Sequence, residues 1–143
     1  MNGEIARPVM PIANPDTKPF WDGCAAGNLL LQRCAACGRM RHPPSPICPH
    51  CLSEVHDWSP ASGHGSVYTF VVVHEERRGW EKLVPYVLAV VELDEGVRMV
   101  TNLVNVAPKD VAIGMPVEVT FAASNDATTR LPLFQPMTAR AAR

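Results

Sequence analysis

Apolar and polar residues alternate along the second half of the chain, from Trp58 onward. Runs rich in β-branched and aromatic residues, separated by short polar or glycine-containing stretches, are typical of β-strands. The sequence predicts five of them: Gly65–His74, Tyr86–Leu93, Val97–Val104, Pro116–Ala123 and the short run LPLFQPM at 131–137. The tripeptide DEG between the second and third runs predicts a tight hairpin turn.

A short helical turn is predicted between the third and fourth strands. The segment APKDVAIGM, residues 107–115, suits one turn of helix followed by a stop at Gly114. Five strands with a helical turn in this position match a small Greek-key barrel of the OB type. The pattern alone leaves other five-stranded barrels open.

The first half of the chain lacks this alternation. Residues 1–14 show no periodicity and contain several prolines, so we expect a flexible arm. A helix is predicted next, with Asp16 or Thr17 as its N-cap and Gly27–Asn28 as its stop. The segment LLLQRC, residues 29–34, then predicts a strand.

The predicted helix has one apolar face, formed by Phe20, Trp21, Cys24 and Ala25. Two interpretations of the aromatic pair stay open. Phe20 and Trp21 either pack against the following lobe or form an exposed contact for a partner. Cys24 is interpreted as a small buried residue, because free cysteine is among the most buried residue types.

The other four cysteines form two Cys-x-x-Cys pairs, Cys34/Cys37 and Cys48/Cys51, with ten residues between the pairs. Each pair can form a knuckle, a tight turn that directs two sulfurs toward one point. Four thiolates suit the tetrahedral preference of Zn²⁺. The spacing therefore predicts a structural zinc site, since a closed four-sulfur shell leaves no position for a catalytic water.

Three alternatives compete with structural zinc. Iron in a rubredoxin-like site uses the same four-sulfur geometry, and geometry does not separate the two metals. Thioredoxin-like redox chemistry requires a βαβ pattern near the cysteines, which the sequence lacks. His42 or His50 could replace a sulfur, although His50 lies inside the second pair and is expected to point away.

Composition narrows the classes of partner. The chain has 143 residues, of which 47% are hydrophobic and 19% charged, as in ordinary globular domains. Its net charge of -1 lacks the basic excess of nucleic-acid binders, so nucleic acid is disfavoured as a partner. Binding of single-stranded nucleic acid by the OB barrel is kept as the alternative function.

No secretory signal or membrane span is visible in the sequence. The N-terminus has no apolar h-region, and the longest apolar run, Leu83–Val91, contains a proline and is far below the ~20 residues of a membrane helix. We expect a soluble, cytoplasmic protein without membrane contact. Thiols stay reduced in that compartment, which favours metal binding over disulfides.

The fold class predicted is mainly β: an N-terminal helix, a rubredoxin-like zinc ribbon and a five-stranded OB-fold barrel. We expect the arm and helix over residues 1–32, the zinc ribbon over 33–57, the barrel over 58–138 and a frayed tail over 139–143.

In this order, the motifs resemble those of a known family. They are PFWDG, LLLQRCAACG, HPPSPICPHC, SGHGSVYTFVVVH, VPYVLAVVELDEGVRMVTNLV, IGMPVEVTF and LPLFQP. From about Pro19 to Pro136 the chain resembles the zinc-ribbon and OB-fold family of acyl-CoA-associated proteins, long catalogued as a domain of unknown function. All four family cysteines are present, and Cys24 lies outside the family pattern.

The resemblance implies a non-catalytic accessory subunit. Members of the family accompany thiolase-fold enzymes that act on acyl-CoA by thiolysis, condensation, acyl transfer or retro-aldol cleavage. The catalytic Cys and His belong to the thiolase-like partner, and the small subunit sometimes helps to enclose the CoA thioester. The sequence itself is consistent with this non-catalytic role, because it has no Gly-rich phosphate loop, His-Glu-x-x-His motif or nucleophile elbow.

The loop HEERRGW, residues 74–80, joins the first two barrel strands, and OB folds often use this loop for ligands. Arg77 and Arg78 could bind CoA phosphates, since guanidinium groups bind phosphate bidentately. Trp80 could stack on adenine or on the partner. The alternative is a solvated loop in which Glu75 and Glu76 balance the two arginines.

Overall fold

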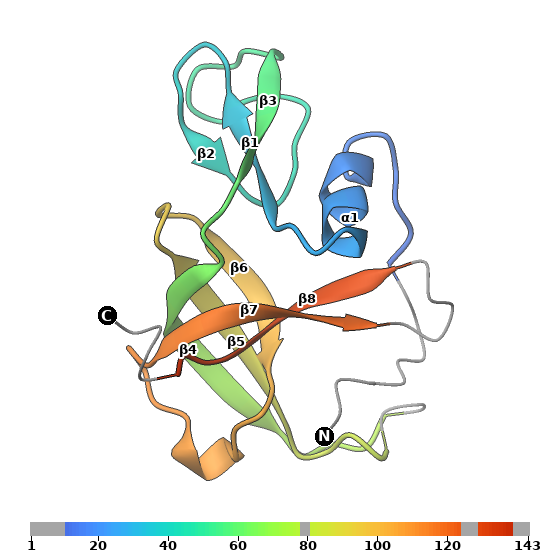
Figure 1. The fold of residues 1–143 in the computed structure, drawn as a ribbon, viewed down its shortest axis with the longest axis vertical. Coiled ribbons are helices and arrows are strands. Elements are labelled where there is room, and N and C mark those ends of the chain that lie inside the picture. Colours follow the sequence, from blue (N-terminus) through green and yellow to red (C-terminus); the bar gives the residue numbers. More distant parts are fainter. Residues whose placement is uncertain (1–10, 78–80, 124–128, 139–143) are drawn as a thin grey trace.

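The computed structural model describes residues 11–77, 81–123 and 129–138. Within them the chain forms one α-helix, a three-stranded sheet and a closed five-stranded barrel (Figure 1). In chain order the elements are α1 Lys18–Ala25, β1 Leu30–Cys34, β2 Met40–Arg41, β3 His56–Pro60, β4 His64–Val73, β5 Tyr86–Leu93, β6 Arg98–Leu103, the 3-10 helix η1 Pro108–Asp110, β7 Pro116–Ala123 and β8 Arg130–Pro136. No helix among the described residues is long and apolar enough to cross a membrane.

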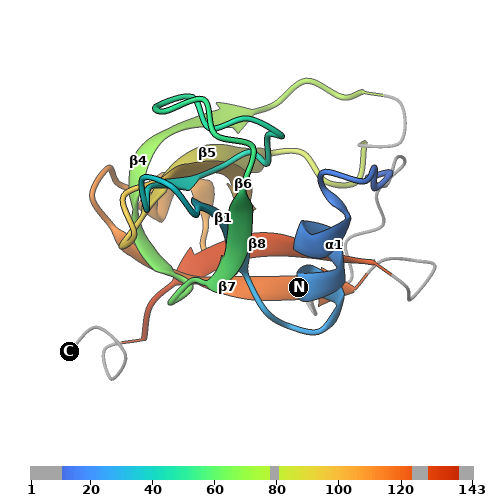
Figure 2. The same cartoon turned by 90° about the horizontal axis from the view of Figure 1, so that it is seen from above.

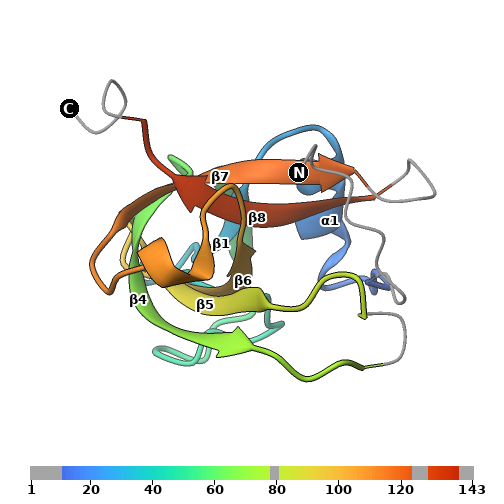
Figure 3. The same ribbon diagram turned by 90° about the horizontal axis from the view of Figure 1, so that it is seen from below.

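The barrel has the strand order β4-β5-β6-β8-β7 and closes by pairing β7 with β4. All five predicted strands are present, and η1 occupies the predicted helical turn. The mainly β fold class with an OB-like barrel is therefore confirmed. Figure 2 shows the barrel from the end that the ribbon covers, and Figure 3 shows the opposite end, where η1 lies.

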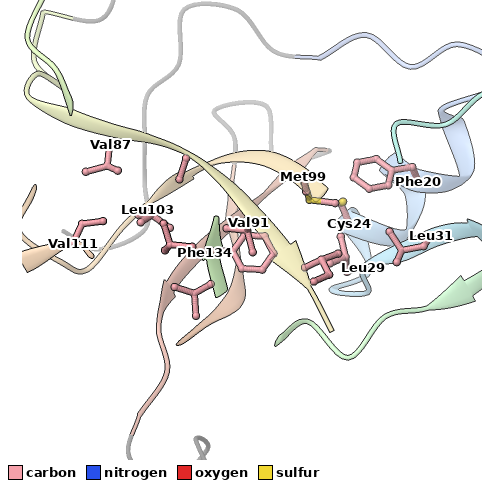
Figure 4. Packing of buried hydrophobic residues seen from close by; sticks show 14 residues of the cluster. Phe20, Cys24, Leu29, Leu31, Val87, Val91, Met99, Leu103, Val111 and Phe134 are labelled. Atoms are coloured by element: carbon pink, nitrogen blue, oxygen red, sulfur yellow. The ribbon is translucent and has the colours of Figure 1, made fainter. Parts of the chain in front are cut away.

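One apolar core extends from the barrel into the ribbon and α1. Alternate residues of β5, from Val87 to Leu93, point into the barrel, and Phe134 lies at its centre. The same cluster continues through Leu29 and Leu31 to the helix, as Figure 4 shows. Since apolar burial is the main favourable term in folding, α1 and the base of the ribbon are stabilised as a lid on the barrel.

Gly65 lies where β4 pairs with two neighbouring strands at once. It pairs with Leu93 of β5 and with Val117 of β7. A Cβ atom at this position would lie 2.4 Å from the carbonyl oxygen of Glu92. Glycine is therefore required where the strand bends to close the barrel.

The small sheet has the order β2-β1-β3. Its longest pairing joins β1 and β3 antiparallel, from Leu30↔Pro60 to Cys34↔His56. The sequence did not predict β3. Its residues HDWSP are all at least partly exposed, so no apolar alternation marks the strand.

The termini of α1 differ in part from the prediction. Thr17 is the N-cap residue, but its side chain makes no capping hydrogen bond. The carbonyl oxygen of the Asn14 side chain instead accepts hydrogen bonds from the backbone N–H groups of Asp16 and Thr17. The stop at Gly27 is confirmed by its φ of 83°, whereas Ala25, expected on the apolar face, is exposed.

Candidate metal centre and the adjoining cavity

Four thiols converge at the end of the ribbon where β1 finishes. The sulfurs of Cys34 and Cys51 are 3.5 Å apart, those of Cys37 and Cys48 are 3.8 Å apart, and all four lie within 4.8 Å of one another. Sulfurs in a tetrahedral shell with zinc–sulfur bonds of about 2.3 Å are separated by about 3.8 Å. The arrangement therefore fits a zinc ion without rearrangement of the backbone.

The two knuckles repeat one backbone design. The N–H of Gly38 donates to the carbonyl of Cys34 at 2.9 Å, and the N–H of Leu52 donates to that of Cys48 at 2.9 Å. Both donors have positive φ, 77° at Gly38 and 65° at Leu52. Glycine adopts this conformation freely, whereas a leucine there is strained by roughly 1 kcal/mol or more.

Backbone N–H groups prepare two of the thiols for metal binding. The N–H of Cys37 points at the Cys34 sulfur, 3.4 Å away, and it lowers the pKa of that thiol to about 6. The N–H of Cys51 likewise lowers the pKa of Cys48. Thiolates are the form that binds metal, so the knuckle backbone favours the ligand state.

Cys24 behaves in the opposite way. It lies on the buried face of α1 and is fully buried in the core, and this burial raises its pKa to about 12. A thiol of that pKa stays protonated and behaves as a small apolar side chain. The interpretation of Cys24 as a buried structural residue is therefore confirmed.

No histidine joins the sulfur cluster in the described part of the chain. His50, inside the second knuckle, is exposed, and its Nδ1 lies 2.7 Å from a guanidinium nitrogen of Arg39 on the first knuckle. This contact links the two turns from outside the cluster.

Two buried polar side chains fix the loop that follows β2. The backbone N–H of Ser45 donates to Oε1 of Gln32 at 2.7 Å, and Nη2 of Arg41 donates to the carbonyl of Ser45 at 2.8 Å. Both side chains are almost fully buried. The residues between β2 and the second knuckle are thus held against β1.

A cavity of about 330 Å³ lies where α1, the loop after β2, β6 and β8 meet. Its walls are mostly apolar, and no side chain among the described lining residues is a Lys, Arg, Asp or Glu. Six of the lining residues are Phe20, Trp21, His42, Val100, Asn102 and Leu133. Nothing in the sequence pattern predicted the cavity, because its walls come from four separate segments.

Burial in this apolar environment lowers the pKa of His42 to about 4, from an ordinary value of 6.5. The imidazole packs against Phe20, with ring centroids 5.1 Å apart. His42 is therefore neutral at physiological pH.

The low pKa of His42 predicts a specific acid sensitivity. Between pH 6.5 and about 4 the unfolded chain binds a proton at this residue that the folded chain does not. The contribution of His42 to stability is complete above pH 6.5 and falls as the pH falls through this window, by about 3 kcal/mol at most.

Urea unfolding of the wild type and of His42→Phe, at several pH values across the window, measures this effect. We expect the wild type to lose more stability than the variant as the pH falls. Acid-driven loss of metal affects both proteins alike, so the difference between the two curves reports His42. Curves that fall in parallel contradict the assignment.

Of the other predicted site residues, the structure describes Phe20, Trp21 and Arg77. Phe20 is only 4% exposed and lies in the core, where it contacts Trp21 edge-on at a centroid distance of 5.0 Å. Trp21 is partly exposed at the cavity. Arg77 is exposed and paired with Glu75 at 3.2 Å, while Arg78 and Trp80 lie outside the described residues.

Comparison with protein families gives two matches that together cover most of the chain. Residues 21–57 match a family described as "ChsH2, rubredoxin-like zinc ribbon domain". Residues 58–122 match one described as "ChsH2, C-terminal OB-fold domain".

Two individual proteins are similar to this chain in sequence over part of their length. The chain is 44% identical over 126 residues to the "Probable enoyl-CoA hydratase alpha subunit" of Thermomonospora curvata, covering 88% of this chain but 39% of that protein. It is 43% identical over 94 residues to the "DUF35 domain-containing scaffold protein" of Methanocaldococcus jannaschii, covering 65% of this chain and 67% of that protein. The chain thus spans well under half of the hydratase subunit and about two thirds of the archaeal scaffold protein.

A solved structure extends the likeness to three dimensions. A chain of the "Ltp2-ChsH2(DUF35) aldolase" superposes with a TM-score of 0.81 at 43% sequence identity, covering 89% of this chain and 98% of that one. At this identity the likeness concerns sequence and fold together.

Proposed function

This chain belongs to the ChsH2 (DUF35) family of zinc-ribbon and OB-fold proteins, and we propose that it is a non-catalytic accessory subunit of an enzyme that acts on acyl-CoA. The observation that carries the proposal is the superposition over 98% of a chain from a two-component aldolase. The names of the two curated relatives, a CoA hydratase subunit and a scaffold protein, support the same role.

The four knuckle cysteines are proposed as the ligands of one structural Zn²⁺. Their convergence and sulfur spacing support this assignment. Bound zinc would join the two knuckles through the cluster, in addition to the contact between Arg39 and His50 on its outside. The chemistry supplied is structural, because four protein ligands complete the preferred shell.

We further propose that the partner is a thiolase-fold subunit and that the CoA thioester is its substrate, shared in part with this chain. The proposal extends the family resemblance of the sequence. The thiolase-like subunit would supply the catalytic groups, and this chain would supply a rigid surface that completes the assembly.

Co-expression with the thiolase-fold protein encoded in the same genome tests the proposal. We expect the two chains to elute together, with one zinc ion per copy of this chain. Turnover of an acyl-CoA substrate by the partner should fall to background when this chain is omitted. Separate elution, together with partner activity indifferent to this chain, would overturn the proposal.

A further inference from the structure

Part of the outer surface of three neighbouring barrel strands is uncharged and mostly apolar, where solvent-facing residues are usually polar. The strand register places Thr69, Val90 and Val100 in one outward row across β4, β5 and β6. It places Val71, Leu88 and Asn102 in the next row. These six residues, here called the β4–β6 face, carry no charge.

Much of this face is open to solvent. The exposed fraction is 55% for Val71, 40% for Leu88 and 68% for Val100. Scattered exposed apolar residues are normal on protein surfaces, but adjacent ones on paired strands form a patch. Contiguous apolar patches mark interaction sites on otherwise polar proteins.

The β4–β6 face is continuous with the cavity beside α1. Val100 and Asn102 belong to both, and the cavity continues to Trp21 and His42. The lining of the cavity holds no Lys, Arg, Asp or Glu among the described residues. A mostly apolar strip therefore leads into an apolar hollow, and neither contains a charged side chain among the described residues.

Charged residues begin at the edge of this surface and are paired there. Arg98 donates to Glu92 at 3.1 Å, and its guanidinium carbon lies 3.8 Å above the ring of Tyr68. An apolar centre with a polar rim is the usual anatomy of a protein–protein interface.

The absence of charged side chains on this surface distinguishes between possible binding partners. Nucleic acid and the phosphates of CoA require cationic partners, and the β4–β6 face and the described cavity lining provide none. An uncharged apolar protein surface is complementary to this one. A hollow beside an exposed, uncharged strip suits an interface in which one large side chain is anchored in a pocket.

We propose that the β4–β6 face and the adjoining cavity form the surface on which the enzyme subunit docks. An uncharged part of that subunit covers the strands, and one of its large apolar side chains enters the cavity beside Trp21. The inference rests on the proposed function, because it takes the occupant to be the partner enzyme. A solved relative that comes from a two-protein aldolase favours such a partner over a second copy of this chain.

The test introduces one charge at the centre of the surface. Val100→Glu places a carboxylate on a side chain that is already 68% exposed, so the isolated chain is expected to fold normally. Ile113→Glu is the matched control, since Ile113 is 70% exposed and lies in the turn after η1, outside the face. Zinc content and thermal unfolding of both variants verify that they fold.

Affinity for the co-expressed thiolase-fold subunit is then measured by calorimetry. We expect Val100→Glu to bind at least about tenfold more weakly than the wild type, because the interface would bury an unpaired charge. Ile113→Glu should bind like the wild type. Wild-type binding that Val100→Glu leaves unchanged overturns the docking surface while the proposed function stands.

Two further outcomes separate the remaining cases. If the wild type itself does not bind the enzyme subunit, the proposed function fails first. If sedimentation shows that the isolated wild type self-associates and that only Val100→Glu is monomeric, with enzyme binding unchanged, a second copy occupies the face and the proposal is wrong.

Discussion

Replacement of Cys37 by serine is expected to abolish zinc binding and to unfold the distal ribbon. Apparent binding free energies of structural zinc in zinc-finger peptides are roughly 10–16 kcal/mol near neutral pH. The whole stability of a typical domain is about 5–15 kcal/mol. A hydroxyl in place of one of the four converging thiols leaves an incomplete shell, so the two knuckles lose the metal that would join them.

The barrel should survive this change. Leu29 and Leu31, at the base of the ribbon, pack in the same core as the barrel residues Val91 and Phe134, and this packing does not involve the metal. We therefore expect local unfolding, in which amide protection against hydrogen exchange is lost at Leu52 and kept at Val91.

Metal analysis and hydrogen exchange of Cys37→Ser check the prediction, with Cys24→Ala as the control. The control also removes one thiol, but from the buried face of α1, so zinc content should stay at one ion per chain. A serine variant that keeps its zinc would show that the four-thiolate assignment is wrong.

Truncation of Phe134 to alanine should cost about 3–5 kcal/mol, the range for deletion of a buried aromatic ring. Phe134 is 0% exposed at the centre of the barrel. It also stands where β8 meets β6, paired with Leu103, and its carbonyl accepts a hydrogen bond from the N–H of Val104 at 2.9 Å. The void left by the missing ring would lie at the pairing of β6 with β8, the shortest strand pairing of the barrel.

Urea unfolding of the zinc-loaded protein measures this loss of stability. Phe121→Ala is the matched control, because it makes the same substitution on β7 at a side chain that is only partly buried. We expect the control to lose clearly less stability. Equal losses at the two positions would mean that Phe134 does not hold the barrel centre together.

Local sequence signals were sufficient for the barrel strands and the knuckles. The alternation from Tyr86 to Leu93 reflects one face in the core and one outside, so its bounds agree with β5. The Cys-x-x-Cys spacing of the two cysteine pairs is enough to predict the tight turn at each pair. These features depend on residues that are near one another in the chain.

The remaining features depend on contacts between distant segments. Strand β3 has no apolar alternation and exists because β1 pairs with it. The cavity takes walls from α1, the loop after β2, β6 and β8, which no single window of sequence contains. In the sequence, the exposed valines of the β4–β6 face are indistinguishable from other strand residues. Only the strand register shows that they form one patch.

The core shared by ribbon and barrel has a consequence for protein engineering. Family boundaries divide the chain between residues 57 and 58, yet Leu29 and Leu31 fill the mouth of the barrel from the other side of that division. A barrel expressed from residue 58 onward would expose apolar core residues at the end that the ribbon covers. We expect such a fragment to aggregate. Exchange of ribbons between relatives would require the residues at this junction to be transferred with them.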